Sequence, residues 1–196
     1  MPEDFASGDY WARREDSLYY RYVDYIVRTV GREAKTLLDV GTGNCPYLEW
    51  FYWIDRKVSI DMRVPYRSET VEGMVGDIHE MDFGEGFDIV TCLQVLEHVP
   101  DASIFGRRLL ELGKIVVVSV PYRWDTSPRT LGHIHDPVTY KKLTAWMGRE
   151  ANYREVVREP FHTRKSERLI AIYDVQAPSR KISSNDIKAR RARMPC

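Results

Sequence analysis

The stretch Thr36-Leu37-Leu38-Asp39-Val40-Gly41-Thr42-Gly43-Asn44 decides the fold of this 196-residue chain. Its first five residues form a short apolar run that is typical of a strand buried on both faces, and Gly41 ends the run. A helical segment at 46–54 follows. A strand, a glycine loop and a helix in this order indicate an open α/β sheet, which binds ligands at the carboxyl ends of its strands. Glycines at 41 and 43 would let a nucleotide-like ligand approach the backbone closely.

The chain on both sides of this loop repeats the alternation of strands and helices. Three further apolar runs are predicted strands: 57–62, 87–95 and 114–120. Four segments have helical periodicity: 16–30, 46–54, 101–112 and 137–147. Asp101 and Asp136 are the expected N-caps of the last two helices. Strands that alternate with helices predict a parallel sheet wrapped on both faces.

The last two apolar runs predict a different ending. A loop without a helical pattern joins 155–158 to 168–175, so these runs are expected to pair as an antiparallel hairpin. The connection after Asp61 is short and has no clear helix, which predicts a reduced second crossover. The sequence shows no internal repeat and no interior linker. We therefore expect one domain over 1–177, which opens with a helical lid at 1–31.

The glycine loop alone fits several nucleotide-binding folds. A dinucleotide fingerprint, G-x-G-x-x-G, would require glycine where the chain has Pro46, so an NAD site is disfavoured. Leu37-Leu38-Asp39-Val40-Gly41-Thr42-Gly43 resembles the first motif of class I S-adenosylmethionine-dependent methyltransferases. Three later segments resemble further motifs of this family in the same order: 59–62, 76–78 and 87–99. The resemblance covers about 36–175.

This resemblance implies a fold, a cofactor and a set of cofactor contacts. The fold is a Rossmann-like methyltransferase: α/β, doubly wound, with a mostly parallel seven-stranded sheet and a C-terminal antiparallel hairpin. The cofactor is S-adenosyl-L-methionine, with Asp61 at the ribose hydroxyls, Asp77 at the adenine amino group and Ile78 against the adenine ring. An aspartate at a strand end can also simply cap the following turn. The expected cofactor-binding residues are Asp39, Gly41, Thr42, Gly43, Asn44, Asp61, Met62, Asp77, Ile78, Leu93 and Gln94.

The acceptor side is expected after the fourth and fifth strands. Methyl transfer from a sulfonium is an in-line displacement, and a base can remove a proton from the acceptor. His98, His133 and His135 are the candidate bases, because the pKa of histidine lies near neutrality. If their segment is extended, His133 and His135 share one face. Tyr122 and Trp124 are the expected acceptor wall, and an aromatic pocket favours a small-molecule acceptor.

A metal-assisted alternative stays open. Glu97, His98 and the two later histidines together make a possible set of metal ligands. The same region resembles small-RNA terminal 2′-O-methyltransferases, which carry Glu-x-x-Glu-His, but Gln94 stands in place of the first Glu. No metal site is therefore assigned. The other enzyme hypothesis is an RNA methyltransferase, and a non-catalytic cofactor-binding or regulatory protein is a hypothesis of a different class.

Composition and charge bound the setting of the protein. The first ten residues lack the apolar stretch of a secretory signal, and no segment approaches the length of a membrane span. The three widely spaced cysteines, Cys45, Cys92 and Cys196, indicate no disulfide frame, so a cytoplasmic location is expected. The net charge is zero, but residues 178–196 carry six basic side chains and one acidic one. This segment is predicted to be a flexible basic tail, or alternatively an RNA-binding arm. The oligomeric state stays open.

Overall fold

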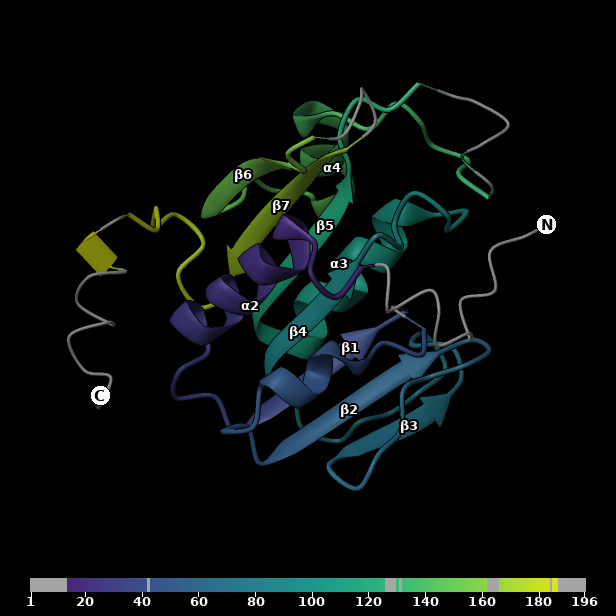
Figure 1. The fold of residues 1–196 in the computed structure, drawn as a ribbon, viewed down its shortest axis with the longest axis vertical. Helices are drawn as coiled ribbons and strands as arrows, with labels where there is room; N and C mark the ends of the chain where they lie inside the picture. The colour runs from purple at the N-terminus through teal and green to yellow at the C-terminus, as the bar shows by residue number, and fades with distance from the viewer. Residues whose placement is uncertain are drawn as a thin grey trace.

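The computed structural model describes residues 14–41, 43–125, 130, 132–161, 166–183 and 185–186 (Figure 1). Its helices and strands alternate along most of the chain. In chain order they are α2 Leu18–Val30, β1 Thr36–Val40, the 3-10 helix η1 Pro46–Trp50, β2 Arg56–Asp61, β3 Val71–Val75, β4 Phe87–Leu93, α3 Ala102–Leu112, β5 Gly113–Pro121, α4 Tyr140–Met147, β6 Tyr153–Arg158 and β7 Glu167–Asp174.

The strands form one seven-stranded sheet in the order β3-β2-β1-β4-β5-β7-β6 (Figure 1). The first five strands of the chain run parallel to one another, and β7 runs antiparallel to both β5 and β6. This arrangement confirms the predicted mostly parallel sheet with its C-terminal hairpin. Because the strand order reverses beside β1, the carboxyl ends of β1 and β4 meet where open α/β sheets bind ligands.

Both faces of the sheet are buried, as the continuous apolar runs predict. Leu38, Val90 and Val116 lie in the core on the face covered by α3 and α4. Leu37 and Ile89 lie in a second core on the face covered by α2 and η1. Successive residues of a strand point to opposite faces, so each strand contributes to both cores.

The helix caps agree with the sequence at one position and differ at another. Asp101 caps α3 by accepting hydrogen bonds from the amides of Ser103 and Ile104, as predicted. Asp136 was expected to cap α4, and that prediction is wrong. Thr139 caps this helix by accepting from the Lys142 amide, because α4 begins three residues later than its apolar pattern.

The predicted helix at 46–54 is a short 3-10 helix. Its amides reach back three residues, as in the 3.3 Å bond from the Phe51 amide to the Leu48 carbonyl. Aromatic residues have modest helix propensity and here pack on one another, with the Tyr47 and Phe51 ring centroids 5.6 Å apart. Side-chain packing in this segment therefore outweighs the local preference for a regular α-helix.

Strand β3 does not belong to the apolar runs found in the sequence and was implied only by the family resemblance. It is an edge strand interrupted by Gly73, and it pairs with β2 from Val71 opposite Lys57 to Val75 opposite Asp61. Residues 62–70 connect β2 to β3 without a helix, which confirms the predicted reduced crossover. Among the described residues, no helix is both long enough and apolar enough to cross a membrane.

The start of the predicted basic tail is attached to the domain. Asn152 donates hydrogen bonds from Nδ2 to the carbonyls of Ala177 and Arg180, and its own carbonyl accepts from the Ile182 amide at 3.0 Å. Lys181 Nζ donates to the Ala151 carbonyl. Residues 178–183 are thus hydrogen-bonded to the domain, and the flexibility predicted from 178 onward stays a prediction. Residues 187–196, with four of the basic side chains, lie outside the described part.

Candidate cofactor and acceptor site

The predicted cofactor segments meet at the carboxyl edge of the sheet. The Gly41 amide donates to the Ile60 carbonyl at 2.7 Å, and the Gly76 amide donates to the Asp61 carbonyl at 3.1 Å. The Gln94 amide in turn donates to the Ser119 carbonyl at 2.9 Å. These bonds continue the sheet pairing just beyond the strand ends. The loops after β1, β2, β3 and β4 are therefore held side by side.

The glycine loop after β1 has the backbone that its sequence requires. Gly41 and Gly43 have φ of 76° and 70°, which residues with a side chain rarely adopt. A Cβ on Gly41 would lie 2.9 Å from Val95, whereas a Cβ on Gly43 would meet nothing within 4 Å. Gly41 thus allows the β4 turn to approach the loop, and Gly43 faces open space. Thr42, also predicted to bind the cofactor, lies outside the described residues, and Asn44 is half-buried.

Asp39 lies beneath the loop. Its side chain is completely buried, and its Oδ1 accepts hydrogen bonds from the Tyr47 hydroxyl at 2.5 Å and the Thr91 hydroxyl at 2.8 Å. This network joins β1, η1 and β4 at the base of the loop. Burial raises the pKa of the adjacent Cys45 thiol, which disfavours the reactive thiolate.

Asp61 and Asp77 stand at the ends of β2 and β3. Asp61 Oδ1 accepts hydrogen bonds from the amides of Arg63 and Val64, and Asp77 Oδ1 accepts from the His79 amide. Each aspartate therefore caps its turn, which is the simple role weighed in the sequence. Both side chains are only half-buried, and these hydrogen bonds fix their position at the carboxyl edge of the sheet.

The other two adenosine-side candidates differ in exposure. Met62 is 66% exposed, whereas Ile78 is 2% exposed and packs in the core that α3 and α4 cover. The structure thus places Met62 where a bound molecule could cover it. Ile78 supports the turn after β3 from below.

The turn after β4 is strained at Gln94. This residue has φ of 59°, a left-handed conformation that is unfavourable for any residue other than glycine. The strand therefore ends at Leu93, two residues before the end of the predicted run, and Leu93 itself is 2% exposed. Such strain persists only where the surrounding structure holds it, and it gathers at functional sites.

Glu97 follows this turn and is the most unusual carboxylate of the described chain. It is completely buried, and no other described residue donates a hydrogen bond to either of its oxygens. Its Oε1 lies 4.0 Å from His98 Nε2, beyond hydrogen-bond distance. Burial raises the pKa of Glu97 to about 8, and the charge of Asp136 acts in the same direction. A buried carboxyl in such surroundings marks a functional-site candidate.

His98 and His133 lie together at this edge. Their ring centroids are 4.6 Å apart and the rings are perpendicular. Burial lowers the pKa of His98, which keeps it neutral and able to accept a proton. His133 Nδ1 lies 2.8 Å from Asp136 Oδ2, and Trp124 stacks on the His133 ring at 5.9 Å. Three of the predicted acceptor-side residues therefore gather in one place.

His135 and Tyr122 do not join this group. His135 Nε2 lies 2.8 Å from the Val99 carbonyl oxygen, and its ring is 5.1 Å from that of Trp146. Residues 134 and 135 form a bend, so the expected common face of His133 and His135, which requires extended backbone, does not form. Tyr122 is 8% exposed and its ring packs 4.9 Å from Tyr140. The geometry of both residues fits packing against α4.

Residues from α2 and β7 lie beside this group. Tyr19 of α2 is buried and its hydroxyl is hydrogen-bonded to Ser119 of β5. The Arg168 guanidinium of β7 lies 5.0 Å from the Tyr19 ring centroid and 5.7 Å from that of Trp124. No local sequence pattern singles out these residues, because only the tertiary fold brings α2 and β7 to the same edge.

One group at this edge has the composition of a metal site. Glu97, His98 and His133 each offer a ligand atom, and the three atoms lie within 4.8 Å of one another. A carboxylate and two imidazoles suit a divalent transition metal.

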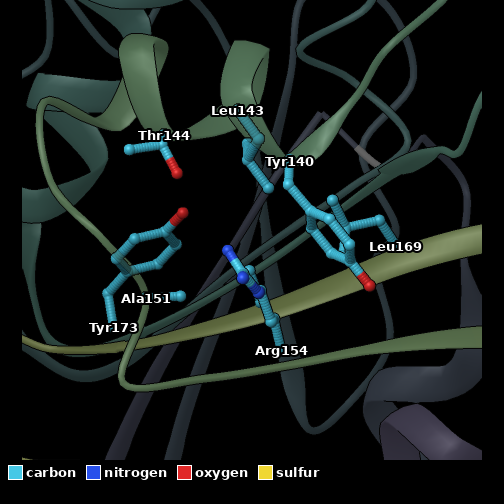
Figure 2. A pocket seen from close by; sticks show the side chains of 8 residues that line it. Tyr140, Leu143, Thr144, Ala151, Arg154, Leu169 and Tyr173 are labelled. Carbon is cyan, nitrogen blue, oxygen red and sulfur yellow. The ribbon is translucent and has the colours of Figure 1, made fainter.

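A separate cavity of about 10 Å³ lies between α4 and the β6–β7 hairpin (Figure 2). Figure 2 shows the Arg154 side chain beside the Tyr140 ring, whose centroid lies 4.3 Å from the guanidinium carbon. A space of this size holds at most one water molecule. It is therefore a packing defect and not a ligand site.

Comparison with known proteins agrees with this geometry. Residues 38–114 match the family model described as a methyltransferase domain. Over this segment the chain is similar to methyltransferase domains, and its fold is the Rossmann-like fold of class I methyltransferases. In fold, this chain is similar to the N-methyltransferase NodS from Bradyrhizobium japonicum, solved with S-adenosylhomocysteine. The TM-score is 0.63 at 16% identity, over 86% of this chain and 92% of that one.

Two relatives resemble it in sequence. It is 33% identical over 110 residues to a ubiquinone biosynthesis O-methyltransferase from Pseudomonas fluorescens, covering 47% of this chain and 45% of that protein. It is 34% identical over 95 residues to a dTDP-4-amino-2,3,4,6-tetradeoxy-D-glucose N,N-dimethyltransferase from Saccharopolyspora spinosa, covering 45% of this chain and 36% of that protein. The chain thus spans less than half the length of either relative.

Proposed function

We propose that this chain is a methyltransferase that binds S-adenosyl-L-methionine across the carboxyl ends of β1 to β4 and transfers its methyl group to an oxygen or nitrogen atom of a small-molecule acceptor. The observation that carries the proposal is the shared edge formed by the Gly41–Gly43 loop, Asp61 and Asp77. The open space before Gly43 and the half-buried carboxylates at the neighbouring strand ends fit an adenosine with its amino acid tail. The names of the two relatives include one oxygen and one nitrogen methyltransferase.

The bound cofactor supplies an electrophilic methyl group on a sulfonium. The chain has to align the acceptor and receive its proton. His98 is held neutral by burial and stands at the edge of β4, where it can accept that proton. The Asp136 carboxylate at His133 Nδ1 favours the tautomer protonated there, which leaves His133 Nε2 as an acceptor. Trp124 forms a flat wall against the same ring.

Calorimetry with S-adenosylmethionine and S-adenosylhomocysteine tests cofactor binding. We expect both to bind, and Asp61→Ala to weaken binding at least ten-fold, about 1.4 kcal/mol, because it removes a carboxylate that accepts from a diol. Asp55→Ala is the matched control, since Asp55 is exposed near the amino end of β2. If neither molecule binds the wild-type protein, the proposal is wrong.

Turnover of labelled cofactor with an extract of small metabolites tests the acceptor class. Incorporation of label distinguishes an enzyme from a binding protein that keeps the fold. We expect His98→Ala to reduce this incorporation. Incorporation only into macromolecules would contradict a small-molecule acceptor. A cytoplasmic location stays a prediction.

The cluster of Glu97, His98 and His133 favours a second candidate, metal-assisted methylation of a terminal RNA 2′-hydroxyl. These residues would hold the divalent ion, whose charge would lower the pKa of an acceptor hydroxyl. The unsatisfied, buried carboxylate of Glu97 is what a metal-binding role requires. This candidate predicts a divalent ion in purified protein and loss of activity on chelation. Activity that survives exhaustive chelation would eliminate it.

The RNA part of this candidate has its own test. Deleting 187–196 removes Lys188, Arg190, Arg191 and Arg193 but keeps the attached residues 178–183. If the tail binds phosphates, the salt dependence of affinity for a single-stranded RNA decreases, because fewer counterions are released. An unchanged slope would exclude the tail as an RNA-binding arm.

A further inference from the structure

A buried hydrogen-bond chain runs from the first helix to the strained turn after β4. It begins at Tyr19 in the first turn of α2, where the backbone is fixed by Glu159, whose carboxylate accepts from the amides of Leu18 and Tyr19 at 2.9 and 2.8 Å. Tyr19 is 1% exposed, and its hydroxyl is hydrogen-bonded to that of Ser119, which is completely buried. A buried tyrosine hydroxyl needs such a partner, so Tyr19 and Ser119 fix each other.

Ser119 also holds Gln94 at two points. Its carbonyl accepts the Gln94 amide at 2.9 Å, and its hydroxyl accepts from Gln94 Nε2 at 3.2 Å. Gln94 is the residue with φ of 59°, so its backbone would relax without these bonds. The hydroxyl of Ser119 therefore lies between the side chains of Tyr19 and Gln94, and each bond restricts the other.

The position of Gln94 decides where its neighbour Val95 lies. Val95 packs against Gly41, since a Cβ added there would be 2.9 Å from Val95 Cγ1 and 3.0 Å from Cγ2. A shift of the turn would therefore change the space beside the glycine loop. The chain of contacts from α2 thus ends at the proposed cofactor pocket.

We propose that Tyr19 and Ser119 are positioning residues for cofactor binding, which hold the Gln94–Val95 turn against Gly41. The expected effect on cofactor affinity rests on the proposed function, because it requires that the protein bind the cofactor. The same contacts also decide how firmly the Gln94 amide is held in the protein without cofactor. The two effects can be measured separately.

Tyr19→Phe removes the hydroxyl and keeps the ring that packs in the core. We expect affinity for S-adenosylhomocysteine to decrease about five- to ten-fold, the size of one lost hydrogen bond. Tyr22→Phe is the matched control on the same helix, because the Tyr22 hydroxyl bonds Tyr153 of β6 at 3.0 Å, away from the β4 turn. This control should leave affinity unchanged. Equal affinities of wild type and Tyr19→Phe would overturn the proposal.

A double-mutant cycle separates positioning from general packing. Gln94→Gly removes the amide side chain and accepts the left-handed backbone without strain. If Tyr19 acts through Gln94, adding Tyr19→Phe to Gln94→Gly weakens binding no further. Full additivity of the two effects would contradict the proposal. If Tyr19→Phe does not fold, Ser119→Ala breaks the same hydrogen-bond chain. The expected loss of affinity and the double-mutant cycle with Gln94→Gly are then the same.

Hydrogen exchange of the protein without cofactor gives an independent readout. Tyr19→Phe is expected to speed exchange at the Gln94 amide at least several-fold, while Tyr22→Phe leaves it unchanged. If wild type fails to bind S-adenosylhomocysteine, the proposed function fails, yet this measurement still decides whether Tyr19 holds the turn. Unchanged exchange at Gln94 in Tyr19→Phe would overturn the positioning role.

Discussion

At the amino end of the sheet, the Asp88 carboxylate accepts hydrogen bonds from the amides of Lys35 and Thr36 and pairs with Lys114 Nζ at 2.7 Å. At the carboxyl end, Glu97 is completely buried, and no other described residue donates a hydrogen bond to its oxygens. The hydrogen bonds of Asp88 join β1, β4 and β5, so this carboxylate stabilises the fold. The Glu97 side chain makes no comparable bonds to described residues, as the site proposed at the carboxyl end would allow.

Backbone strain is also present at the carboxyl end. Gln94 has a positive φ there, which is unfavourable for a residue with a side chain, whereas the two glycines of the loop adopt it readily. Burial lowers the pKa of His98 at the same end. Backbone strain and the desolvation of ionisable groups cost stability, and they persist where function requires them. Substitutions at the carboxyl end should therefore change binding, whereas substitutions at the amino end should change the stability of the fold.

The largest effect is expected at Gly41. Gly41→Ala adds a side chain in a left-handed backbone, at about 1 to 2 kcal/mol, and places its Cβ 2.9 Å from Val95. Affinity for S-adenosylhomocysteine should decrease about 100-fold in calorimetry. Gly148→Ala is the control, since its φ is 68° but nothing lies within 4 Å of the added Cβ. Comparable affinity losses in both variants would break the comparison.

At the amino end, Asp88→Asn is expected to lower the free energy of unfolding by about 1 to 3 kcal/mol, because it weakens hydrogen bonds to a charged acceptor. Affinity for S-adenosylhomocysteine in the folded protein should not change. Asp55→Asn is the control: it removes an exposed pair with Lys35, of 72% and 70% side-chain exposure, and should change stability little. A loss of affinity in Asp88→Asn would show that the two ends are coupled.

Acid should reveal the same contribution of Asp88. Burial acts to raise its pKa, but the hydrogen bonds from Lys114, Lys35 and Thr36 outweigh this and hold the pKa below its usual value. A carboxyl whose pKa is lower in the folded state contributes stability above its unfolded pKa of about 3.9 and loses it as pH falls further. The stability difference between wild type and Asp88→Asn should therefore shrink below about pH 4 in denaturant titrations. A difference that stays constant down to pH 2 would contradict this assignment.

The smallest effect, of opposite sign, is expected at Glu97. Glu97→Gln replaces a buried carboxyl that gains no hydrogen bond from its described neighbours with a neutral side chain of the same shape. The free energy of unfolding should stay equal or increase by about 1 kcal/mol at pH 7. Thermal unfolding of chelator-treated protein measures it. A clear loss of stability would show that Glu97 has a structural role after all.

The sequence predicted the structural features that depend on interactions between neighbouring residues, such as helix caps and buried strands. Asp101 caps α3 because the cap depends on its own neighbours, and the buried runs became strands because burial on both faces leaves a clear pattern. Edge strand β3 carries a weak pattern, since an edge needs fewer apolar residues and Gly73 interrupts it. At 46–54, aromatic packing across the turn replaced the α-helix that the local pattern indicated.

The candidate site was predictable on its cofactor side and only partly on its acceptor side. The ends of β1 to β4 lie together because parallel strands share an edge, so Gly41, Asp61 and Asp77 follow from the sequence. The loop between β5 and α4 has no such rule, and the bend at 134–135 turned His135 away from His133. Tyr19 could not be found from sequence, because its partner Ser119 is 100 residues away.

Strand β7 lies between β5 and β6, although it follows both of them in the chain. Until residues 167–174 leave the ribosome, the Ile115–Val118 stretch of β5 has an unpaired edge, and its core lacks Ile170 and Ala171. An open apolar edge of this kind can pair with another nascent chain. Completion of the sheet, and with it resistance to aggregation during translation, thus depends on β7.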